Sequence, residues 1–147
     1  MGSDPTPGET TIVPDASVVA KLLFPERGSS AARHALDAAD ALAAPDLLFA
    51  EVANTVRTKV RRGDASAAAA ADLATAVASL PVEALPLSGL TADALALALA
   101  LDHPVYDCYY VATAIARDAV LVTADRRLHA LATRVGFGER VRLIETD

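Results

Sequence analysis

The stretch VYDCYYVATAIARDAVLVTADRRL, residues 105–128, decides the fold. Its first half repeats apolar positions at helical spacing, namely Tyr106, Tyr109, Tyr110, Thr113 and Ala114. Pro104, just upstream, suits the start of a helix, and the run VLV at 120–122 is typical of a short buried strand. Asp107 therefore lies in the first turn of a helix, and Asp125 lies just beyond a strand. Sites in open α/β sheets form beyond the carboxyl ends of strands, so Asp125 stands where a site is expected.

The rest of the chain repeats this alternation of short apolar runs and helical patterns. Five strands are predicted near residues 11–14, 41–44, 82–86, 119–123 and 141–144. The stretches between them have helical patterns, which predicts a parallel α/β sheet covered by helices on both faces. The last strand is expected at a sheet edge. With no internal repeat and no linker, residues 11–147 are predicted to form one domain after a flexible polar leader, residues 1–10.

The composition suits one domain whose core has few aromatic side chains. The 147 residues are 53% hydrophobic and 4% aromatic, with no Trp, so Ala, Leu and Val must build the interior. No apolar run reaches the roughly 18 residues of a membrane span, and no secretory signal is expected. The single cysteine, Cys108, is compatible with a reducing cytoplasm, the expected location.

The charge balance disfavours a broad nucleic-acid-binding face. The chain has 19 acidic and 13 basic residues, a formal net charge of −6. Such a chain is not expected to hold nucleic acid on a wide basic surface. Acids that converge on divalent cations are an exception, because the bound metal reverses the local charge where a phosphate would approach. The net charge therefore does not exclude a nucleic-acid substrate.

Several acidic or hydroxyl side chains are expected to begin helices. Asp15 follows the first strand and can cap the helix after it, and Asp46 and Thr91 are expected to do the same farther on. Asp64 is expected to open the alanine-rich helix that runs to Leu80. For Asp102 and His103, polarity of a loop is favoured over a metal-binding pair.

Three features permit both a structural and a functional interpretation. Asp15 alone reads as a helix cap, and Glu51, early in a long helix, reads as an ordinary exposed glutamate. The densest basic cluster comprises Arg57, Lys59, Arg61 and Arg62. Cations suit the carboxyl end of a helix, yet the same cluster can hold a phosphate backbone.

Four acids far apart in sequence are expected to meet. Asp15 and Asp125 follow predicted strands, and Glu51 and Asp107 lie early on helices, positions that a parallel sheet brings to one edge. Unpartnered carboxylates at one place repel and become partly protonated. Mg²⁺ or Mn²⁺ relieves this repulsion, because these cations prefer oxygen ligands and bind phosphate oxygens as well. The pattern thus indicates metal-assisted phosphoryl chemistry.

Four segments in this order resemble the PIN-domain nucleases, most of all the VapC-type toxins of bacterial toxin–antitoxin pairs. They are IVPDASVVAKLLFPE (12–26), PDLLFAEVANTV (45–56), VYDCYYVATA (105–114) and LVTADRRL (121–128). The family's Asp after the first strand matches Asp15, its Glu with an Asn three residues on matches Glu51 and Asn54, and its LVT-x-D element ends at Asp125. Its YDA-like helix start matches Tyr106-Asp107-Cys108, with Cys where Ala is more usual.

The resemblance implies a three-layer α/β/α PIN-like domain with a central, mostly parallel sheet, and a Mg²⁺- or Mn²⁺-dependent endoribonuclease. Asp15, Glu51, Asp107 and Asp125 would hold the metal, with Ser17, Asn54 and Thr123 orienting them. The implied substrate is transfer RNA or another structured RNA, and the implied partners are a VapB-like antitoxin and a second copy of the chain. The RNA-contact candidates are the basic residues Arg57, Lys59, Arg61, Arg62, Arg126 and Arg127.

Three other interpretations compete with this one. A receiver-type phosphoacceptor domain needs a lysine after its last strands, whereas Lys21 and Lys59 lie on predicted helices. A nucleophile built on Cys108 is disfavoured, because the charge of Asp107 raises the pKa of the thiol. A non-catalytic PIN-like module that binds a partner protein stays open, although the presence of all four acids argues against a degenerate site.

Overall fold

The central sheet of the protein is entirely parallel. The computed structural model describes residues 8–144, so most of the predicted leader, residues 1–7, and residues 145–147 lie outside the described part. Five strands form one sheet in the order β3-β2-β1-β4-β5. They are β1 (Thr11–Pro14), β2 (Ala41–Pro45), β3 (Val82–Leu85), β4 (Val120–Thr123) and β5 (Val141–Leu143). The predicted parallel sheet is confirmed, and β5 lies at an edge as expected.

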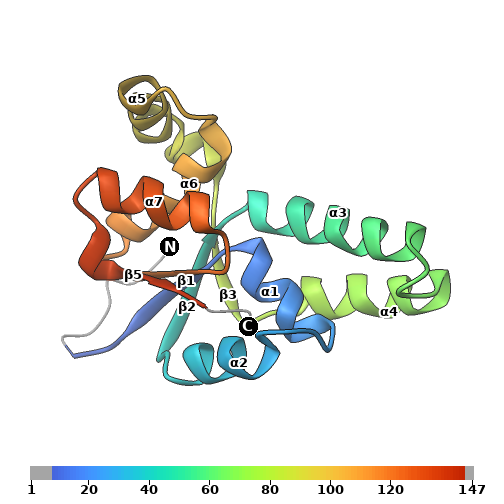
Figure 1. The fold of residues 1–147 in the computed structure, drawn as a ribbon. Coiled ribbons are helices and arrows are strands. Elements are labelled where there is room, and N and C mark those ends of the chain that lie inside the picture. Colours follow the sequence, from blue (N-terminus) through green and yellow to red (C-terminus); the bar gives the residue numbers. More distant parts are fainter. Residues whose placement is uncertain (1–7, 145–147) are drawn as a thin grey trace.

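Helices fill the segments between the strands (Figure 1). They are α1 (Ala16–Leu23), α2 (Ser29–Asp37), α3 (Leu47–Arg61), α4 (Ala67–Ala78), α5 (Thr91–Leu101), α6 (Val105–Ala116) and α7 (Arg126–Arg134). Short 3-10 turns cover Leu87–Gly89 and Gly138–Arg140. No helix within residues 8–144 is both long and apolar enough to cross a membrane.

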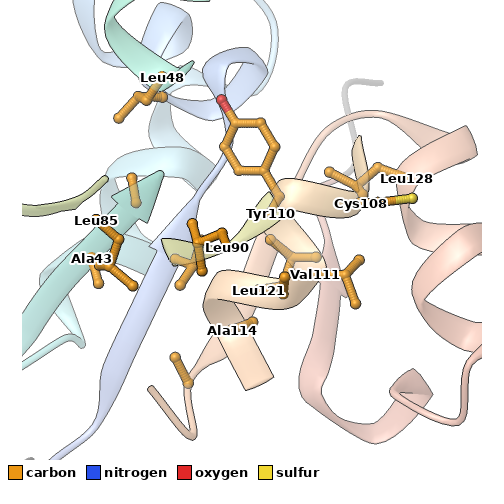
Figure 2. Packing of buried hydrophobic residues seen from close by; sticks show 14 of the residues in the cluster. Ala43, Leu48, Leu85, Leu90, Cys108, Tyr110, Val111, Ala114, Leu121 and Leu128 are labelled. Carbon is orange, nitrogen blue, oxygen red and sulfur yellow. The ribbon is translucent and has the colours of Figure 1, made fainter. Parts of the chain in front are cut away.

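Neighbouring residues of the central strands point to opposite faces of the sheet. Ile12 and Val122 join a buried cluster with Val18 of α1 and Ala32 of α2. Their neighbours on the strands, Val13 and Leu121, join a second and larger cluster on the other face. This cluster includes Val111 and Ala114 of α6 and Leu128 of α7. Figure 2 shows this cluster around Tyr110, Val111 and Leu121. The alternation follows from the two-residue period of a strand and produces the predicted three layers.

Helices α3 and α4 lie side by side and project from the body of the domain (Figure 1). Leu48, Val52 and Val56, spaced four residues apart, are buried and form an apolar stripe along α3. Gly63 makes the turn between the two helices with φ +81°, a value that glycine adopts without strain. Glu51 lies near the start of α3, at the end of the α3–α4 pair that is close to the sheet.

Three predicted helix starts differ from the structure. Asp46 already has helical backbone angles, φ −53° and ψ −23°, and its side chain caps nothing, because a cap needs an extended backbone. Thr91 lies inside α5 and its hydroxyl bonds to Leu87 O, so the prediction of a cap there is wrong. The alanine-rich helix begins at Ala67 rather than Asp64, since Ser66 caps it through Ala69 N.

The carboxyl ends of all five strands lie along one edge of the sheet, since every strand pair is parallel. Asp15 follows β1 directly, and Asp125 follows β4 after one intervening residue. The helices α3 and α6, which carry Glu51 and Asp107, both begin at this edge: α3 follows the end of β2, and α6 packs against β1, β2 and β4. The fold therefore directs all four acids toward one region.

Candidate active site

Asp15 is the most buried of the four acids and the most fully hydrogen-bonded. Its side chain caps α1 by accepting from Val18 N at 3.1 Å, so the predicted helix cap at Asp15 is confirmed. Ser17 Oγ donates to Oδ1 at 2.6 Å and Thr123 Oγ1 donates to Oδ2 at 2.5 Å. Burial raises the pKa of Asp15, against the opposing effect of these bonds, and the charge of Asp125 adds to the rise. A simple cap does not need two hydroxyl donors.

The two hydroxyls also join Asp15 to the loop after β4. Thr123 Oγ1 accepts from Asp125 N at 2.9 Å, and Ser17 Oγ accepts from Ala124 N at 3.0 Å. Asp125 in turn caps α7 by accepting from Arg127 N at 2.8 Å. The ends of β1 and β4, which are neighbours in the sheet, are thus locked together through side chains that each act as both donor and acceptor.

Glu51 is held by a residue that sequence reasoning missed. Tyr110 Oη donates to Glu51 Oε1 at 2.5 Å, and Tyr110 belongs to the buried cluster that Figure 2 shows. Partial burial raises the pKa of Glu51, the tyrosine bond lowers it, and the charges of Asp107 and Asp15 raise it further. Asn54, one of the predicted orienting residues, is exposed and lines a recess of about 410 Å³ together with Glu51.

Asp107, in the first turn of α6, has a histidine partner. His103 Nε2 lies 2.9 Å from Asp107 Oδ2, although sequence reasoning assigned His103 to loop polarity. The four-residue spacing of the two, together with the proline between them that starts a helix, was the signal that could have predicted the contact. His103 and Asp107 line a second recess, of about 190 Å³, together with Tyr106 and Arg127.

The four acids share one electrostatic region without forming a closed metal cage. The charge of Asp125 acts on Asp15, and the charges of Asp107 and Asp15 act on Glu51. Among residues 8–144, however, no three side chains of His, Cys, Asp or Glu lie close enough to hold a metal ion as they stand. The assignment of the four acids as metal ligands stays a prediction, and in this arrangement Tyr110 and His103 hold two of the carboxylates.

The donor set nevertheless suits a divalent cation. All four side chains offer carboxylate oxygens, the ligands that Mg²⁺ and Mn²⁺ prefer. Burial raises the pKa values of Asp15 and Glu51, and the charges of neighbouring carboxylates add to the rise, so ionisation of these two acids costs free energy. A cation would remove that cost by stabilising the ionised forms.

The basic residues named from the sequence fall into two groups. Arg126 and Arg127 begin α7 at the edge that carries the acids, and Arg127 lines the recess beside Asp107. The others lie in the second half of α3 or just beyond its end, away from that edge: Arg57, Lys59, Arg61 and Arg62. Lys59 bonds to Glu26 at 2.8 Å and sits 5.1 Å from the ring of Phe24, so its charge is already partnered.

The competing interpretations find little support in the structure. Cys108 is buried, and burial raises the pKa of its thiol, with the charge of Asp107 adding to the rise. Lys21 lies on α1 and Lys59 on α3, and both contact Glu26 rather than the strand ends. Neither a thiolate nucleophile nor a receiver-type lysine is therefore placed at the carboxyl edge.

Comparisons with known proteins cover nearly the whole chain. A family model described as the PIN domain matches residues 12–133. The chain is 36% identical over 121 residues to Ribonuclease VapC3 from Pyrobaculum aerophilum, which covers 80% of this chain and 91% of that protein. It is also similar to the crystal structure of PAE2754 from Pyrobaculum aerophilum, with a TM-score of 0.62 and 25% identity over 86% of this chain and 88% of that chain. The matched range contains Asp15, Glu51, Asp107 and Asp125.

Proposed function

Because this chain belongs to the PIN-domain family, we propose that it is an endoribonuclease that uses Mg²⁺ or Mn²⁺ to cut RNA phosphodiester bonds. The substrate proposed is transfer RNA or another structured RNA, met in the cytoplasm. The observation that carries the proposal is Asp15: a buried carboxylate, 5% exposed, held by Ser17 and Thr123 at the edge where three further acids converge. A relative named as a ribonuclease supports the choice of RNA.

The metal would be held by Asp15, Glu51, Asp107 and Asp125. When bound, Mg²⁺ or Mn²⁺ supplies Lewis acidity and an activated water for attack on phosphorus. The chain's own task is to keep the acids ionised and aimed. Ser17 and Thr123 leave Asp15 little rotational freedom, and Tyr110 occupies one oxygen of Glu51 and leaves the other for the cation.

Positive charge near the acids would bring the RNA phosphate to the site. Without a cation the carboxylates would repel a phosphodiester, so binding of RNA is proposed to depend on the metal. Arg127, on the recess beside Asp107, is placed to contact a phosphate next to the one that is cut. Arg126, the exposed first residue of α7, adds a second positive charge next to Arg127.

The chain is further proposed to be the toxin of a toxin–antitoxin pair and to form a homodimer. Apolar side chains support binding of other chains: Leu95, Leu99 and Ile115 are exposed on α5 and α6. A mostly apolar groove of about 450 Å³ between α3 and α4, lined by Phe49, Val56 and Val77 among others, offers a second surface. Exposed apolar patches of this kind commonly mark interfaces.

Cleavage of total RNA and of transfer RNA by the purified protein tests the proposal. The assay compares Mg²⁺, Mn²⁺ and a chelator, for wild type, Asp15→Asn and Asp107→Asn. Asp72→Asn, an exposed acid on α4, is the matched control for loss of one negative charge. We expect metal-dependent cutting that the first two substitutions abolish and the control retains.

The non-catalytic module is the alternative that this assay can establish. Circular dichroism first verifies that each variant is folded. If folded wild-type protein cuts no RNA with either metal, or if all variants cut equally, the nuclease proposal fails. A protein that binds a partner but cuts nothing would then be a binding module.

A further inference from the structure

Tyr106 is an exposed aromatic side chain beside the acids. Among residues 8–144 the large hydrophobic side chains left exposed are Leu95, Leu99, Tyr106 and Ile115. Leu95 and Leu99 lie on α5, and Ile115 lies at the far end of α6. Tyr106 alone of these four adjoins one of the acids, Asp107, and the residue is 60% exposed. Hydrophobic packing within the domain does not account for a ring at this position.

Two recesses meet at the ring of Tyr106. The recess of about 410 Å³ runs along α3 past Glu51 and Asn54, and Tyr106 closes one side of it. The recess of about 190 Å³ contains Asp107 and Arg127, and Tyr106 lines it as well. Tyr106 therefore lines both the recess that contains Glu51 and the recess that contains Asp107, so a chain that occupies both recesses would contact this residue.

The chemistry around the ring suits one nucleotide of a single strand. An exposed aromatic face stacks any base, because every base presents a π-face. Arg127, on the same recess, supplies charge for a phosphate, and the carboxylates on both sides suit the cation that would hold the next phosphate. A base, an arginine-bound phosphate and a metal-bound phosphate are the consecutive parts of one RNA strand.

We propose that Tyr106 stacks an unpaired base of the RNA beside the phosphate that is cut, and so acts as a specificity-determining residue. The proposal rests on the nuclease function proposed above. Stacking requires a base that is free of its helix, so the ring selects unpaired nucleotides at this position. The hydroxyl of Tyr106 has no part in stacking, whereas the ring is essential. Tyr106 lies in the first turn of α6, which begins at Val105 and buries Cys108.

Binding of a short single-stranded RNA that carries 2-aminopurine tests the proposal, since stacking on an aromatic ring quenches this base. Fluorescence anisotropy and quenching are measured with Ca²⁺ in place of Mg²⁺, to hold back cleavage. Tyr106→Ala should weaken binding roughly tenfold, within the range that stacking one base contributes, and should abolish the quenching. Tyr106→Phe should keep both. His34→Ala, which removes an exposed ring from α2, should change neither.

Distinct outcomes would overturn the stacking role. Equal binding and quenching by Tyr106→Ala and His34→Ala would refute stacking by Tyr106. Loss of binding in Tyr106→Phe would also refute it, because the effect would then belong to the hydroxyl. If size-exclusion chromatography shows that Tyr106→Ala changes the oligomeric state and leaves RNA binding intact, the ring is a protein contact. Each of these results leaves metal-dependent cleavage by wild type standing, whereas absence of that cleavage would refute the nuclease itself.

Discussion

Tyr110 Oη lies 2.5 Å from Glu51 Oε1 and joins two helices across 59 positions of sequence. Tyr110 is buried, and its hydroxyl donates to the carboxylate of Glu51. Burial and the neighbouring carboxylates raise the pKa of Tyr110, so the phenol stays protonated and always donates. A permanent donor at this place fixes the direction of one carboxylate of the site.

Tyr110→Phe should destabilise the fold and weaken the site together. Removing the hydroxyl leaves Oε1 of a half-buried carboxylate without its donor, at a cost of about 1–2 kcal/mol in the free energy of unfolding. The pKa of Glu51 should rise further, because this bond lowers it, and more metal should be needed for half-maximal cleavage. Urea unfolding and a Mg²⁺ titration of cleavage measure the two effects.

Tyr109→Phe is the control for that substitution. Tyr109 is the neighbour of Tyr110 on the same helix, and its hydroxyl lies 2.8 Å from Thr91 Oγ1 in an exposed contact. Its loss should change the unfolding free energy by less than about 0.5 kcal/mol and leave the metal requirement unchanged. If both tyrosine variants behave alike, Tyr110 has no special role toward Glu51.

Thr123→Val should disable the site with little change of shape. The buried hydroxyl donates to Asp15 and accepts from Asp125 N, and valine can do neither. We expect a loss of about 1–3 kcal/mol in stability, from two buried groups left unpaired, and cleavage lowered roughly 10- to 100-fold. Thr123→Ser keeps the hydroxyl and should retain most of the activity. Equal cleavage by the valine variant and wild type would contradict this role.

The metal-free protein should lose stability as the pH rises. The pKa of Asp15 is raised by burial, so the folded state retains a proton that the unfolded state has already lost. The contribution of Asp15 to stability therefore falls from about pH 4 upward until the folded-state pKa is passed, and Glu51 contributes in the same direction. Melting temperatures in chelator across this range measure the slope.

Asp15→Asn isolates the contribution of Asp15 to that slope. Groups with the opposite sign, such as Asp118, whose pKa is lowered by Arg140, are present in both proteins and cancel in the difference. The variant should show the flatter profile and should gain less stability on addition of Mg²⁺ near neutral pH. Identical slopes for the two proteins would show that Asp15 is ionised at no cost in the fold.

His103→Ala should weaken metal binding. His103 Nε2 holds Asp107 Oδ2, and loss of such a supporting contact typically lowers metal affinity roughly tenfold or more. Isothermal titration with Mn²⁺ measures this without any cleavage assay. His34→Ala, on the exposed side of α2, is the matched control and should bind Mn²⁺ as wild type does. If His103→Ala binds Mn²⁺ with unchanged affinity, the contact between His103 and Asp107 only stabilises the start of α6.

Arg127→Ala and Arg61→Ala should separate the two basic groups. Arg127 lines the recess beside Asp107, whereas Arg61 follows Glu51 by 61 − 51 = 10 residues and so lies about 15 Å farther along α3. Arg127→Ala should lower RNA affinity and reduce the salt slope of binding by about one, and Arg61→Ala should change both less. A larger effect of Arg61 would move the RNA path onto the projecting helices.

The sequence allowed the strands, their parallel arrangement and the position of Asp15 to be predicted, because these depend on local apolar patterns. It also indicated Ser17 and Thr123, whose hydroxyls do contact Asp15. The role of Tyr110 was not predicted, because its position in the helical pattern is that of an ordinary core residue. Glu51, its partner, lies 59 positions away in the sequence. The cap at Asp46 was mispredicted because its backbone conformation is set by pairing with β3, through Asp46 N and Leu85 O at 2.9 Å.

The bond between Thr123 and Asp15 spans 108 positions of the chain, and that length bears on when the protein becomes active during its synthesis. While β4 is still inside the ribosome during synthesis, Thr123 cannot bond to Asp15. Tyr110 is also made late, so for most of that time it cannot bond to Glu51. The site is therefore assembled only after more than four-fifths of the residues have been joined. A fragment released early by premature termination would be inert toward the cell's RNA.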